Sequence, residues 1–209
     1  MSICQWGLPM STQAKIENRI KYIEKGLPFS IDSFYEAGSK ASVQQSFSRL
    51  AKKGAIARVG RGIYCRPKPL KSIPSIKTVA SAEDIARLWA RQNRYKLVAQ
   101  GQEEAYKLGL QTQAPIIKLY WTNGPSREFI VGKQRVKVVK VNSELLSWGN
   151  APEGRLLRAL SVFQNYELPA EKLKIAFSRL KISNSEGKKL LCKLTNRFHK
   201  NNVLPNLNL

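Results

Sequence analysis

The segment GSKASVQQSFSRLAKKGAIARVGRGIYC, residues 38–65, contains the clearest structural pattern in the chain. Its first half places apolar side chains at the spacing of one helical face, at Val43, Phe47, Leu50 and Ala51. Ser39 is a residue type that caps helix N-termini, and Gly54 is one that ends helices. We therefore predict a helix between Ser39 and Gly54.

The remaining surface of this predicted helix is polar or basic and contains no Asp or Glu. Its side chains offer donors and acceptors that suit base edges and phosphates better than a protein core. The residues that we expect to contact DNA are Ser39, Lys40, Ser42, Gln44, Gln45, Ser48, Arg49, Lys52 and Lys53. Those expected to read or approach bases are Lys40, Ser42, Gln44, Gln45 and Arg49. Phosphates are assigned to Lys52 and Lys53.

A short β-hairpin is predicted after Gly54. Two β-type segments, near residues 56–58 and 63–65, are joined by the tight turn Gly60-Arg61-Gly62. The turn places Arg61 at its tip, where a guanidinium can enter a minor groove or hold a phosphate. The basic residues of this region that we expect to contact DNA are Arg58, Arg61 and Arg66. A polar helix followed by a basic hairpin is typical of a winged helix.

Two shorter helices are predicted before this segment. The first covers residues 11–25, is ended by Gly26, and has an apolar face formed by Ile16, Ile20 and Ile23. The second begins after Ser30. Three helices and a hairpin therefore fit within residues 11–67, which we interpret as a winged helix-turn-helix domain. A small three-helix domain with solvated polar faces would give a similar pattern, but the acid-free helix and the basic hairpin favour DNA binding.

The charge of the whole chain agrees with a polyanionic partner. The 209 residues include 36 Lys and Arg against 14 Asp and Glu, a formal net charge of +22. The excess is spread over the whole length rather than gathered in one tail. Because 43% of the residues are hydrophobic, the chain can fill a core, and a disordered basic tail is a poor interpretation.

The cellular compartment is predicted from what the sequence lacks. No apolar run approaches the roughly 20 residues that span a bilayer, and the N-terminus has no secretory pattern. Cys4, Cys65 and Cys192 are odd in number and far apart, which fits a reducing compartment and gives no zinc-binding spacing. We expect a cytoplasmic protein with no membrane partner, metal or cofactor. Residues 1–9 are interpreted as a frayed leader or an early start codon before Met10.

The second part of the chain mixes strand and helix patterns. Residues 68–75 contain prolines without an apolar period and predict an extended linker. In the domain that follows, residues 76–209, strand patterns fall between about 96 and 141 and helical patterns between about 152 and 200. The predicted fold class is therefore α+β, with a small, mostly antiparallel sheet and a helical tail behind the winged helix.

Individual elements of this domain can be placed from local signals. Ser81 with Asp84, and Ser183 with Glu186, have the spacing of a capping box. The predicted strands are residues 96–99, 116–122, 127–131 and 135–141, and the predicted short helix is 103–108. Pro152 suits the first turn of one of the later helices. Pro169 is assigned the same position in the next helix.

Further polar residues of this domain are candidates for contact with a partner or a phosphate. They are Thr112, Gln113, Ser126, Arg127, Lys189, Lys193 and Arg197. The turn Asn123-Gly124-Pro125-Ser126-Arg127 can present a hydroxyl and a guanidinium, although Asn-Gly and Pro are first of all turn chemistry. The last three residues recur every four positions and form a basic stripe, which is usually a solvated helix face.

Two blocks of residues carry a resemblance to a known family. The first block is Gly38, Ser39, Ala41, Val43, Ser48, Arg49, Leu50, Lys53, Gly54, Ile56, Arg58, Gly62, Tyr64 and Pro67. The second is Gly101, Ala105, Leu108-Gly109-Leu110, Thr112-Gln113, Pro115, Tyr120, Thr122 and Gly124-Pro125-Ser126-Arg127. With these residues the chain resembles the AbiEi-type antitoxins and transcriptional regulators of abortive-infection systems, in particular shorter relatives with an N-terminal winged helix. It departs from their pattern at Gln111, where the family has Ser.

The resemblance implies a repressor and an antitoxin. Proteins of this type bind repeats in the promoter of their own operon through the winged helix, and their C-terminal part counteracts a nucleotidyltransferase-like toxin in phage defence. The implied partners are therefore double-stranded promoter DNA and such a toxin, bound by a monomer or a homodimer. The alternative is a general nucleic-acid-binding protein without a toxin partner.

Catalysis is disfavoured by the inventory of reactive side chains. The histidine is His199, and the two aspartates, Asp32 and Asp84, fall in different predicted domains. Hydrolytic triads need a placed histidine, and metal-dependent nucleases need clustered carboxylates. The sequence also has no Walker loop, dinucleotide fingerprint or nucleophile elbow. We therefore do not predict an enzyme.

Overall fold

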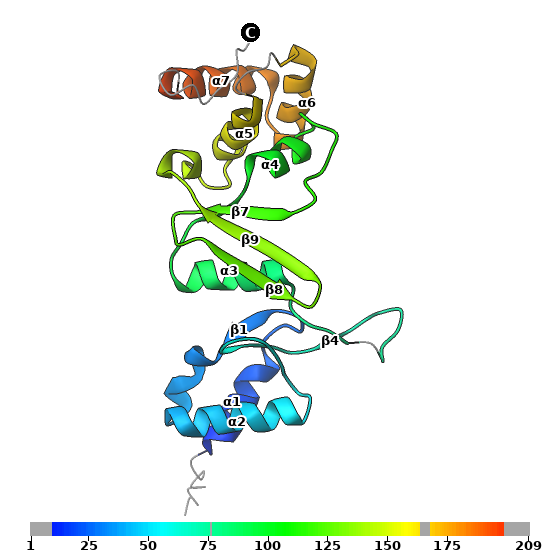
Figure 1. Cartoon of the computed structure of the whole chain (residues 1–209), viewed down its shortest axis with the longest axis vertical. Helices are drawn as coiled ribbons and strands as arrows, with labels where there is room; N and C mark the ends of the chain where they lie inside the picture. The colour runs from blue at the N-terminus through cyan, green and yellow to red at the C-terminus, as the bar shows by residue number, and fades with distance from the viewer. Residues whose placement is uncertain (1–9, 76, 164–167, 199–209) are drawn as a thin grey trace, which may run out of the picture. The chain divides into compact units, whose positions relative to one another are not determined.

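A computed structural model describes residues 10–75, 77–163 and 168–198 of the chain (Figure 1). The interpreted leader, residues 1–9, and His199 lie outside the described residues. The chain divides into two units, Met1–Leu88 and Trp89–Leu209, so the division falls inside a helix. Both units combine helices with small sheets, and the predicted α+β class is confirmed. The linker expected at residues 68–75 stays a prediction as a domain boundary.

Unit 1 begins with a helix that is shorter than the sequence indicated. Helix α1 (Thr12–Lys21) is capped by Ser11, whose hydroxyl accepts a hydrogen bond from the backbone N of Ala14. The helix buries Ile16 and Ile20, the two residues of the predicted apolar face that lie within it. It ends at Lys21, with Tyr22 as its C-cap, several residues before the predicted stop at Gly26.

A short strand, unpredicted from the sequence, separates α1 from the next helical segment. Strand β1 (Pro28–Ser30) leads directly into the 3-10 helix η1 (Ile31–Ala37), which takes the place of the predicted second helix. The turn begins at Ser30, whose hydroxyl accepts a hydrogen bond from the backbone N of Asp32. Three residues are too few to show an alternating pattern, and for this reason the sequence did not indicate β1.

Helix α2 (Lys40–Lys52) confirms the helix predicted between Ser39 and Gly54. The Ser39 hydroxyl accepts a hydrogen bond from the backbone N of Ser42 at 3.3 Å, and this caps the first turn. The buried face contains Val43, Phe47 and Leu50, together with Ser46. The Ser46 hydroxyl is satisfied because it donates to the backbone O of Ser42 at 2.9 Å. Gly54 has a φ of +69°, which favours glycine and ends the helix.

The predicted hairpin is formed by β2 (Ala57–Gly60) and β3 (Ile63–Cys65). Strand β3 lies in the middle of an antiparallel three-stranded sheet of order β1-β3-β2, with Tyr64 opposite both Phe29 and Arg58. The turn places Arg61 at the tip next to Gly62, whose φ is +71°. The register shifts between Arg58 and Gly60, so the strand is irregular where it approaches the turn.

An aromatic cluster holds the helices of unit 1 against this sheet. The ring of Phe47 lies 5.2 Å from that of Phe34 and 4.9 Å from that of Tyr64, both at steep interplanar angles. Phe29 of β1 also contacts Phe34 and Phe47. Edge-to-face contacts of this kind add to the free energy gained by burying the rings. The orientation of α2 relative to the hairpin is therefore set by the core of unit 1.

Unit 2 contains a four-stranded sheet of order β6-β7-β9-β8. The strands are β6 (Leu97–Ala99), β7 (Lys118–Thr122), β8 (Arg127–Val131) and β9 (Gln134–Lys140). Two of the three neighbouring pairs are antiparallel, whereas β7 and β9 are parallel, so the sheet is small and mostly antiparallel as predicted. Trp89, near the end of α3 (Ala82–Gln92), packs its ring 5.5 Å from that of Phe129 on β8.

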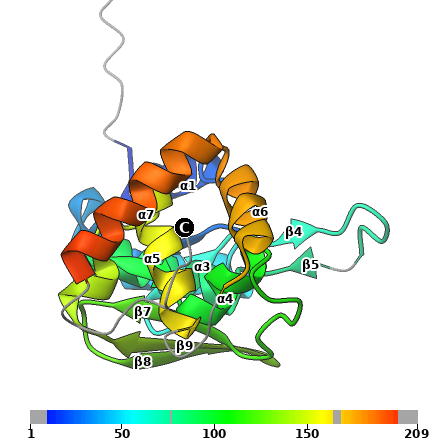
Figure 2. The same ribbon diagram turned by 90° about the horizontal axis from the view of Figure 1, so that it is seen from above.

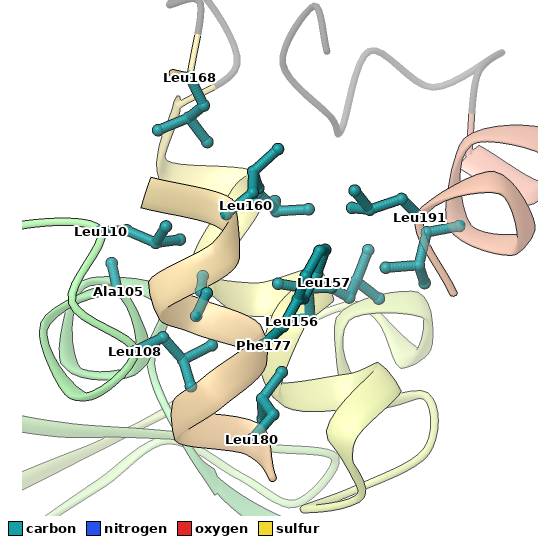
Figure 3. Close-up of a cluster of buried hydrophobic side chains, with 14 residues drawn as sticks. Ala105, Leu108, Leu110, Leu156, Leu157, Leu160, Leu168, Phe177, Leu180 and Leu191 are labelled. Atoms are coloured by element: carbon teal, nitrogen blue, oxygen red, sulfur yellow. The ribbon is translucent and has the colours of Figure 1, made fainter. Parts of the chain in front are cut away.

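The helices of unit 2 share a second core. They are α4 (Gly101–Lys107), η2 (Ser143–Leu146), α5 (Pro152–Leu160), η3 (Ser161–Phe163), α6 (Ala170–Leu180) and α7 (Asn184–Phe198). Figure 2 shows α5, α6 and α7 grouped together. Their apolar side chains converge with those that follow α4, and Leu108, Leu156, Leu157 and Leu160 are fully buried (Figure 3).

The helix starts predicted from capping boxes and prolines are confirmed with one exception, whereas the helix predicted at residues 103–108 begins earlier, at Gly101. The Ser81 hydroxyl accepts from the backbone N of Asp84 at 3.1 Å, and the Asp84 carboxylate accepts from the backbone N of Ser81 at 3.1 Å. Ser183 and Glu186 form the same reciprocal pair at the start of α7. Pro152 lies in the first turn of α5, but Pro169 is the residue before α6 and serves as its N-cap.

Candidate nucleic-acid interface

The polar face of α2 is open to solvent along its length. The predicted DNA-contacting residues with exposed side chains are Ser39, Lys40, Gln44, Gln45, Ser48, Arg49, Lys52 and Lys53, and Ser42 is partly buried. Lys40, Gln44 and Ser48 recur every four residues and therefore form one line along the helix. All of the residues proposed to contact DNA from this helix thus stand on or beside one accessible surface.

A groove separates the first half of this line from the hairpin β2–β3. It has a volume of about 590 Å³ and is lined on one side by Lys40 and Gln44 and on the other by Arg58 and Arg61. Four residues predicted from the sequence as two separate sets therefore face a single hollow. The other lining residues are Ile31, Asp32, Tyr35, Gly62 and Tyr64. The sequence did not indicate these five residues as contacts, because they come from η1, from the turn of the hairpin and from its far strand β3.

The cations around the groove are not neutralised by carboxylates. Among the described residues, Lys40, Arg58 and Arg61 form no ion pair within 4.0 Å. Lys40 Nζ lies 5.5 Å above the centre of the Tyr35 ring, which orients the ammonium without cancelling its charge. Arg58 Nε donates to the backbone O of Gly60 at 3.3 Å. The groove therefore presents positive charge to a ligand.

Asp32 is the acidic residue in the groove lining. Its carboxylate accepts a hydrogen bond from the Ser30 hydroxyl at 3.1 Å, and this fixes the side chain at the start of η1. A carboxylate repels phosphate, but it can accept a hydrogen bond from the amino group of cytosine. Asp32 therefore adds a hydrogen-bond acceptor to the groove and lowers its positive potential.

Arg49 connects the exposed face of α2 with α1. Its guanidinium donates from Nη1 to Gln13 Oε1 at 3.4 Å, and Gln13 in turn donates to Glu17 at 2.9 Å. The hydrogen bond is long, and the Arg49 side chain remains exposed. The arrangement leaves Arg49 able to exchange this partner for a base or a phosphate.

Arg66 has a different environment from the other basic residues of the hairpin region. It is half-buried, and its Nη1 donates to the backbone O of Lys21 at 2.6 Å and of Ile23 at 2.7 Å. One carbonyl belongs to the last residue of α1 and the other lies just after the helix, where carbonyls lack intrahelical partners. The structure thus gives Arg66 an anchoring role that the sequence did not indicate. We therefore leave it out of the direct interface proposed below.

The loop of unit 2 that contains Thr112 and Gln113 is held in place by its neighbour. Gln111 Nε2 donates to the backbone O of Gln102 at 3.0 Å and of Gln113 at 2.8 Å. The Thr112 and Gln113 side chains are exposed. Gln111, the position at which the chain departs from the AbiEi pattern, is thus structural, and a partner contact by Thr112 or Gln113 stays a prediction.

Ser126 and Arg127 are both engaged within unit 2. The Ser126 hydroxyl accepts from the backbone N of Lys140 at 2.9 Å, and the Arg127 guanidinium lies 5.7 Å from the centre of the Trp89 ring. In the same turn, Asn123 Oδ1 accepts from the backbone N of Lys96 at 2.7 Å. These contacts account for the turn residues without a ligand, and they support the turn-chemistry interpretation.

The basic stripe of α7 packs partly on an aromatic ring. Lys193 Nζ and the Arg197 guanidinium lie 5.4 Å and 4.7 Å from the centre of the Trp148 ring. Lys193 also approaches Glu153 at 3.8 Å. Lys189 lines a hollow of about 310 Å³ beside the same pair. The stripe thus belongs to the packing between α7 and the start of α5, and a partner contact there stays a prediction.

A buried ion cluster in unit 2 has no signal in the sequence. Glu104 on α4 is 3% exposed and pairs with Arg155 at 3.0 Å and with the fully buried Arg158 at 3.4 Å, both on α5. Arg158 Nη1 also donates to the backbone O of Gly149 at 2.6 Å. Burial lowers the pKa of Arg158, and the Glu104 carboxylate opposes that shift. The cluster joins α4 to α5 over more than fifty positions of sequence.

In the described ranges, groups of three or more His, Cys, Asp or Glu side chains that could hold a metal ion do not occur. None of the helices in those ranges combines the length and the apolar character that a bilayer span requires. The Cys65 thiol is buried, and its burial raises its pKa.

The fold and the groove together define a basic α+β protein with a candidate nucleic-acid interface. Residues 15–184 match a family described as a family of unknown function (DUF6088), and the chain belongs to this family. A similar solved structure is that of the RV2827C protein from Mycobacterium tuberculosis, with 13% identity and a TM-score of 0.39 over 88% of this chain and 82% of that chain. A search of curated proteins found no match.

Proposed function

We propose that this protein is a DNA-binding transcriptional regulator that represses its own operon. The groove between α2 and the hairpin β2–β3 carries the proposal, because it joins the amide of Gln44 and the ammonium of Lys40 to the guanidinium groups of Arg58 and Arg61. Amide side chains suit adenine edges, and guanidinium groups suit guanine edges and phosphates. The same groove offers both sequence readout and electrostatic affinity.

In this proposal, residues 11–67 act as a winged helix-turn-helix. The order of elements supports the assignment: α1, β1, η1 and α2 are followed by a hairpin, and the sheet has the order β1-β3-β2. Helix α2 then lies in the major groove, which is wide enough to admit one helix. The hairpin forms the wing, with Arg61 at its tip directed at the backbone or the neighbouring minor groove.

The roles of the side chains follow from their positions. Bases are read or approached by Lys40, Ser42, Gln44, Gln45 and Arg49. Phosphates are held by Lys52, Lys53, Arg58 and Arg61. Repression results because a protein bound across the promoter excludes the transcription machinery from it. Phosphate contacts set the register on the duplex, whereas base contacts set the sequence preference.

The test compares binding to two duplexes. The DNA upstream of the protein's own gene and a scrambled duplex of equal length are titrated with purified protein at physiological salt and with excess competitor. A regulator should prefer the upstream DNA by about a thousandfold or more. Equal affinity for both duplexes would contradict the proposal and favour the alternative, a general nucleic-acid-binding protein.

A double variant checks the assignment of base readout to α2. Gln44→Ala with Gln45→Ala should reduce the preference for the upstream DNA more than the affinity for scrambled DNA, because amides contribute contacts rather than charge. Gln92→Ala, an exposed glutamine at the end of α3, is the matched control. If the double variant lost the same factor on both duplexes, α2 would not read bases.

An antitoxin role for residues 76–209 is a separate proposal, which rests on the AbiEi resemblance. The observation in its favour is the exposed pair Thr112 and Gln113, which lies in the second block of that resemblance. The test is co-expression with a nucleotidyltransferase-like protein encoded beside the gene, if the locus has one. Rescue of growth by the wild type, and its loss on replacing Thr112 and Gln113 by Ala, is the expected result. Unchanged growth with that variant would contradict the assignment of these residues.

A further inference from the structure

The acid-free character of α2 continues well beyond the hairpin. Between Glu36 and Glu83 the chain has no Asp or Glu, and this stretch contains ten Lys and Arg residues. Its last part includes the predicted linker, residues 68–75, and contains two paired strands. They are β4 (Lys68–Pro69), at the start of that linker, and β5 (Lys77–Thr78), just after it. We call residues 68–75 together with residues 77–78 the β-arm; residue 76 lies outside the described residues and is no part of this definition.

The β-arm projects from the rest of unit 1 (Figures 1 and 2). Its lysines, Lys68, Lys71 and Lys77, are all exposed. Between them, Leu70 is 37% and Ile73 is 50% exposed, and Pro74 follows Ile73 near the tip. A solvated linker gains nothing from exposing large aliphatic side chains, whereas a contact element gains apolar area when it is covered.

Both ends of the β-arm are anchored to unit 1. On the incoming side, Arg66 bonds the carbonyls of Lys21 and Ile23, and its own backbone O accepts from the backbone N of Gly26 at 2.8 Å. On the outgoing side, the backbone N of Ala80 donates to Cys65 Sγ at 3.4 Å. Within the arm, the Thr78 hydroxyl donates to the backbone O of Lys68 at 3.0 Å. The base is thus fixed while the tip is free to meet a ligand.

We propose that the β-arm is a second DNA-contacting element, in which Lys68, Lys71 and Lys77 hold phosphates while Ile73 and Pro74 enter a minor groove as an apolar wedge. The inference rests on the proposed function, because it needs a duplex already held by α2 and the hairpin. Lysines flanking an aliphatic tip are suited to the minor groove, where inserted Ile, Leu or Pro side chains unstack a base step and bend the duplex.

The dimensions of the β-arm allow this contact. From Lys68 to Ile73 an extended chain spans up to about 17 Å, and a minor groove is about 6 Å wide. The arm begins three residues after β3, so its base belongs to the same compact unit as Arg61. The arm therefore lengthens the proposed footprint along the duplex without a second domain.

The first test removes the charge of the β-arm. The triple variant Lys68→Gln, Lys71→Gln, Lys77→Gln is titrated with the upstream duplex over a range of salt concentrations. Loss of three phosphate contacts should lower the salt-dependence exponent by about 2 to 3 and weaken binding about tenfold or more at physiological salt. The control, Lys107→Gln, Lys133→Gln, Lys174→Gln, removes the same charge from exposed positions of unit 2. Equal losses for the two triple variants would overturn the proposal.

The second test addresses the wedge. Ile73→Ser should reduce the bend measured by energy transfer between the two ends of a labelled duplex, whereas Ile73→Leu should retain it. Because Ile73 is half exposed, neither change is expected to affect folding, and an unchanged Tm verifies this. A bend that Ile73→Ser leaves at its wild-type value would overturn the minor-groove insertion.

The two proposals fail in distinguishable ways. If the wild type does not prefer the upstream duplex, the proposed function fails, and the β-arm proposal fails with it. A second pattern of results would refute the β-arm proposal alone. In that pattern the wild type prefers the upstream duplex, the Gln44 and Gln45 double variant loses this preference, and the β-arm variants bind like the wild type. A β-arm variant could also bind DNA like the wild type but fail to bind a protein that the wild type binds. That result would assign the β-arm to a protein partner and overturn the inference.

Discussion

At the scale of single residues, the basic side chains of unit 1 differ in how far contacts within the protein already occupy them. Lys40 rests on the Tyr35 ring, and Arg49 makes one long hydrogen bond to Gln13, so both can be recruited at low cost. Arg66 makes two short charge-assisted hydrogen bonds to backbone carbonyls, so its guanidinium would have to break them to contact DNA. Residue type alone does not separate these cases, because all three are basic residues of one acid-free stretch.

Replacing Asp32 should strengthen binding to DNA of any sequence. The Asp32→Asn variant removes the acidic side chain of the groove lining, so random duplex should bind about two- to fivefold more tightly, the range expected for a partly screened charge. Titration of scrambled duplex at low and physiological salt measures the effect. Glu24→Gln, an exposed acidic residue between α1 and β1, is the control. Weaker binding of Asp32→Asn to every duplex would mean that the groove does not face phosphate.

Removing the buried carboxylate of unit 2 should destabilise the protein strongly. Glu104→Ala leaves Arg158 buried and Arg155 half-buried without their anion, and loss of one partner of a buried ion pair costs about 3–5 kcal/mol. Denaturant unfolding measures the change. Glu171→Ala breaks the exposed pair with Lys174 and should cost about 1 kcal/mol or less. Similar losses for the two variants would show that the Glu104 cluster is not desolvated.

At the scale of elements, helices with a cap and a periodic face were predictable and isolated short strands were not. Ser39, Val43 and Phe47 supply local signals that place α2. Strand β1 has three residues, and β4 and β5 have two each, so no alternation can be seen in them. These strands exist because a distant segment provides the hydrogen-bonding partner. For the same reason, the groove residues from η1 and the role of Arg66 were missed.

The cap of α7 should respond to acid in a defined direction. Hydrogen bonds from the backbone and side chain of Ser183 lower the pKa of Glu186 below its ordinary value. The contribution of the ionised Glu186 carboxylate to the free energy of unfolding is therefore fully present above the unfolded-state pKa. It is lost as the pH falls through the lower folded-state pKa. Titration of Glu186 by NMR should show a midpoint below the ordinary range for Glu. A midpoint at or above that range would contradict the cap geometry.

At the scale of the whole molecule, the proposed function gives affinity for nucleic acid and sequence specificity separate origins. The net charge of +22 is spread over the chain, so it attracts any duplex, whereas the residues proposed to read bases are confined to α2. The α+β class and most elements of unit 2 followed from local patterns. Contacts such as Glu104 with Arg158 did not, because they join positions that are close only after folding.

Because affinity is assigned to charge and sequence preference to base contacts, the two quantities should respond differently to salt. Binding to scrambled duplex should weaken steeply, by about a thousandfold or more between low and physiological salt if six or more phosphates are contacted. The preference for the upstream duplex over the scrambled one should change much less, since phosphate contacts are common to both. Parallel titrations of the two duplexes provide the measurement. If the preference for the upstream duplex disappeared together with the affinity for both duplexes, specificity would depend on charge alone.

The parallel pairing of β7 with β9 has a consequence for the order of folding. Strand β8 lies between them in sequence but at the edge of the sheet, where its neighbour is β9 alone. The β8–β9 hairpin can therefore form by itself within microseconds, whereas its attachment to β7 requires closure of a longer loop. Substitutions at the turn between β8 and β9 should accordingly act mainly on the folding rate, and those in β6 mainly on the unfolding rate.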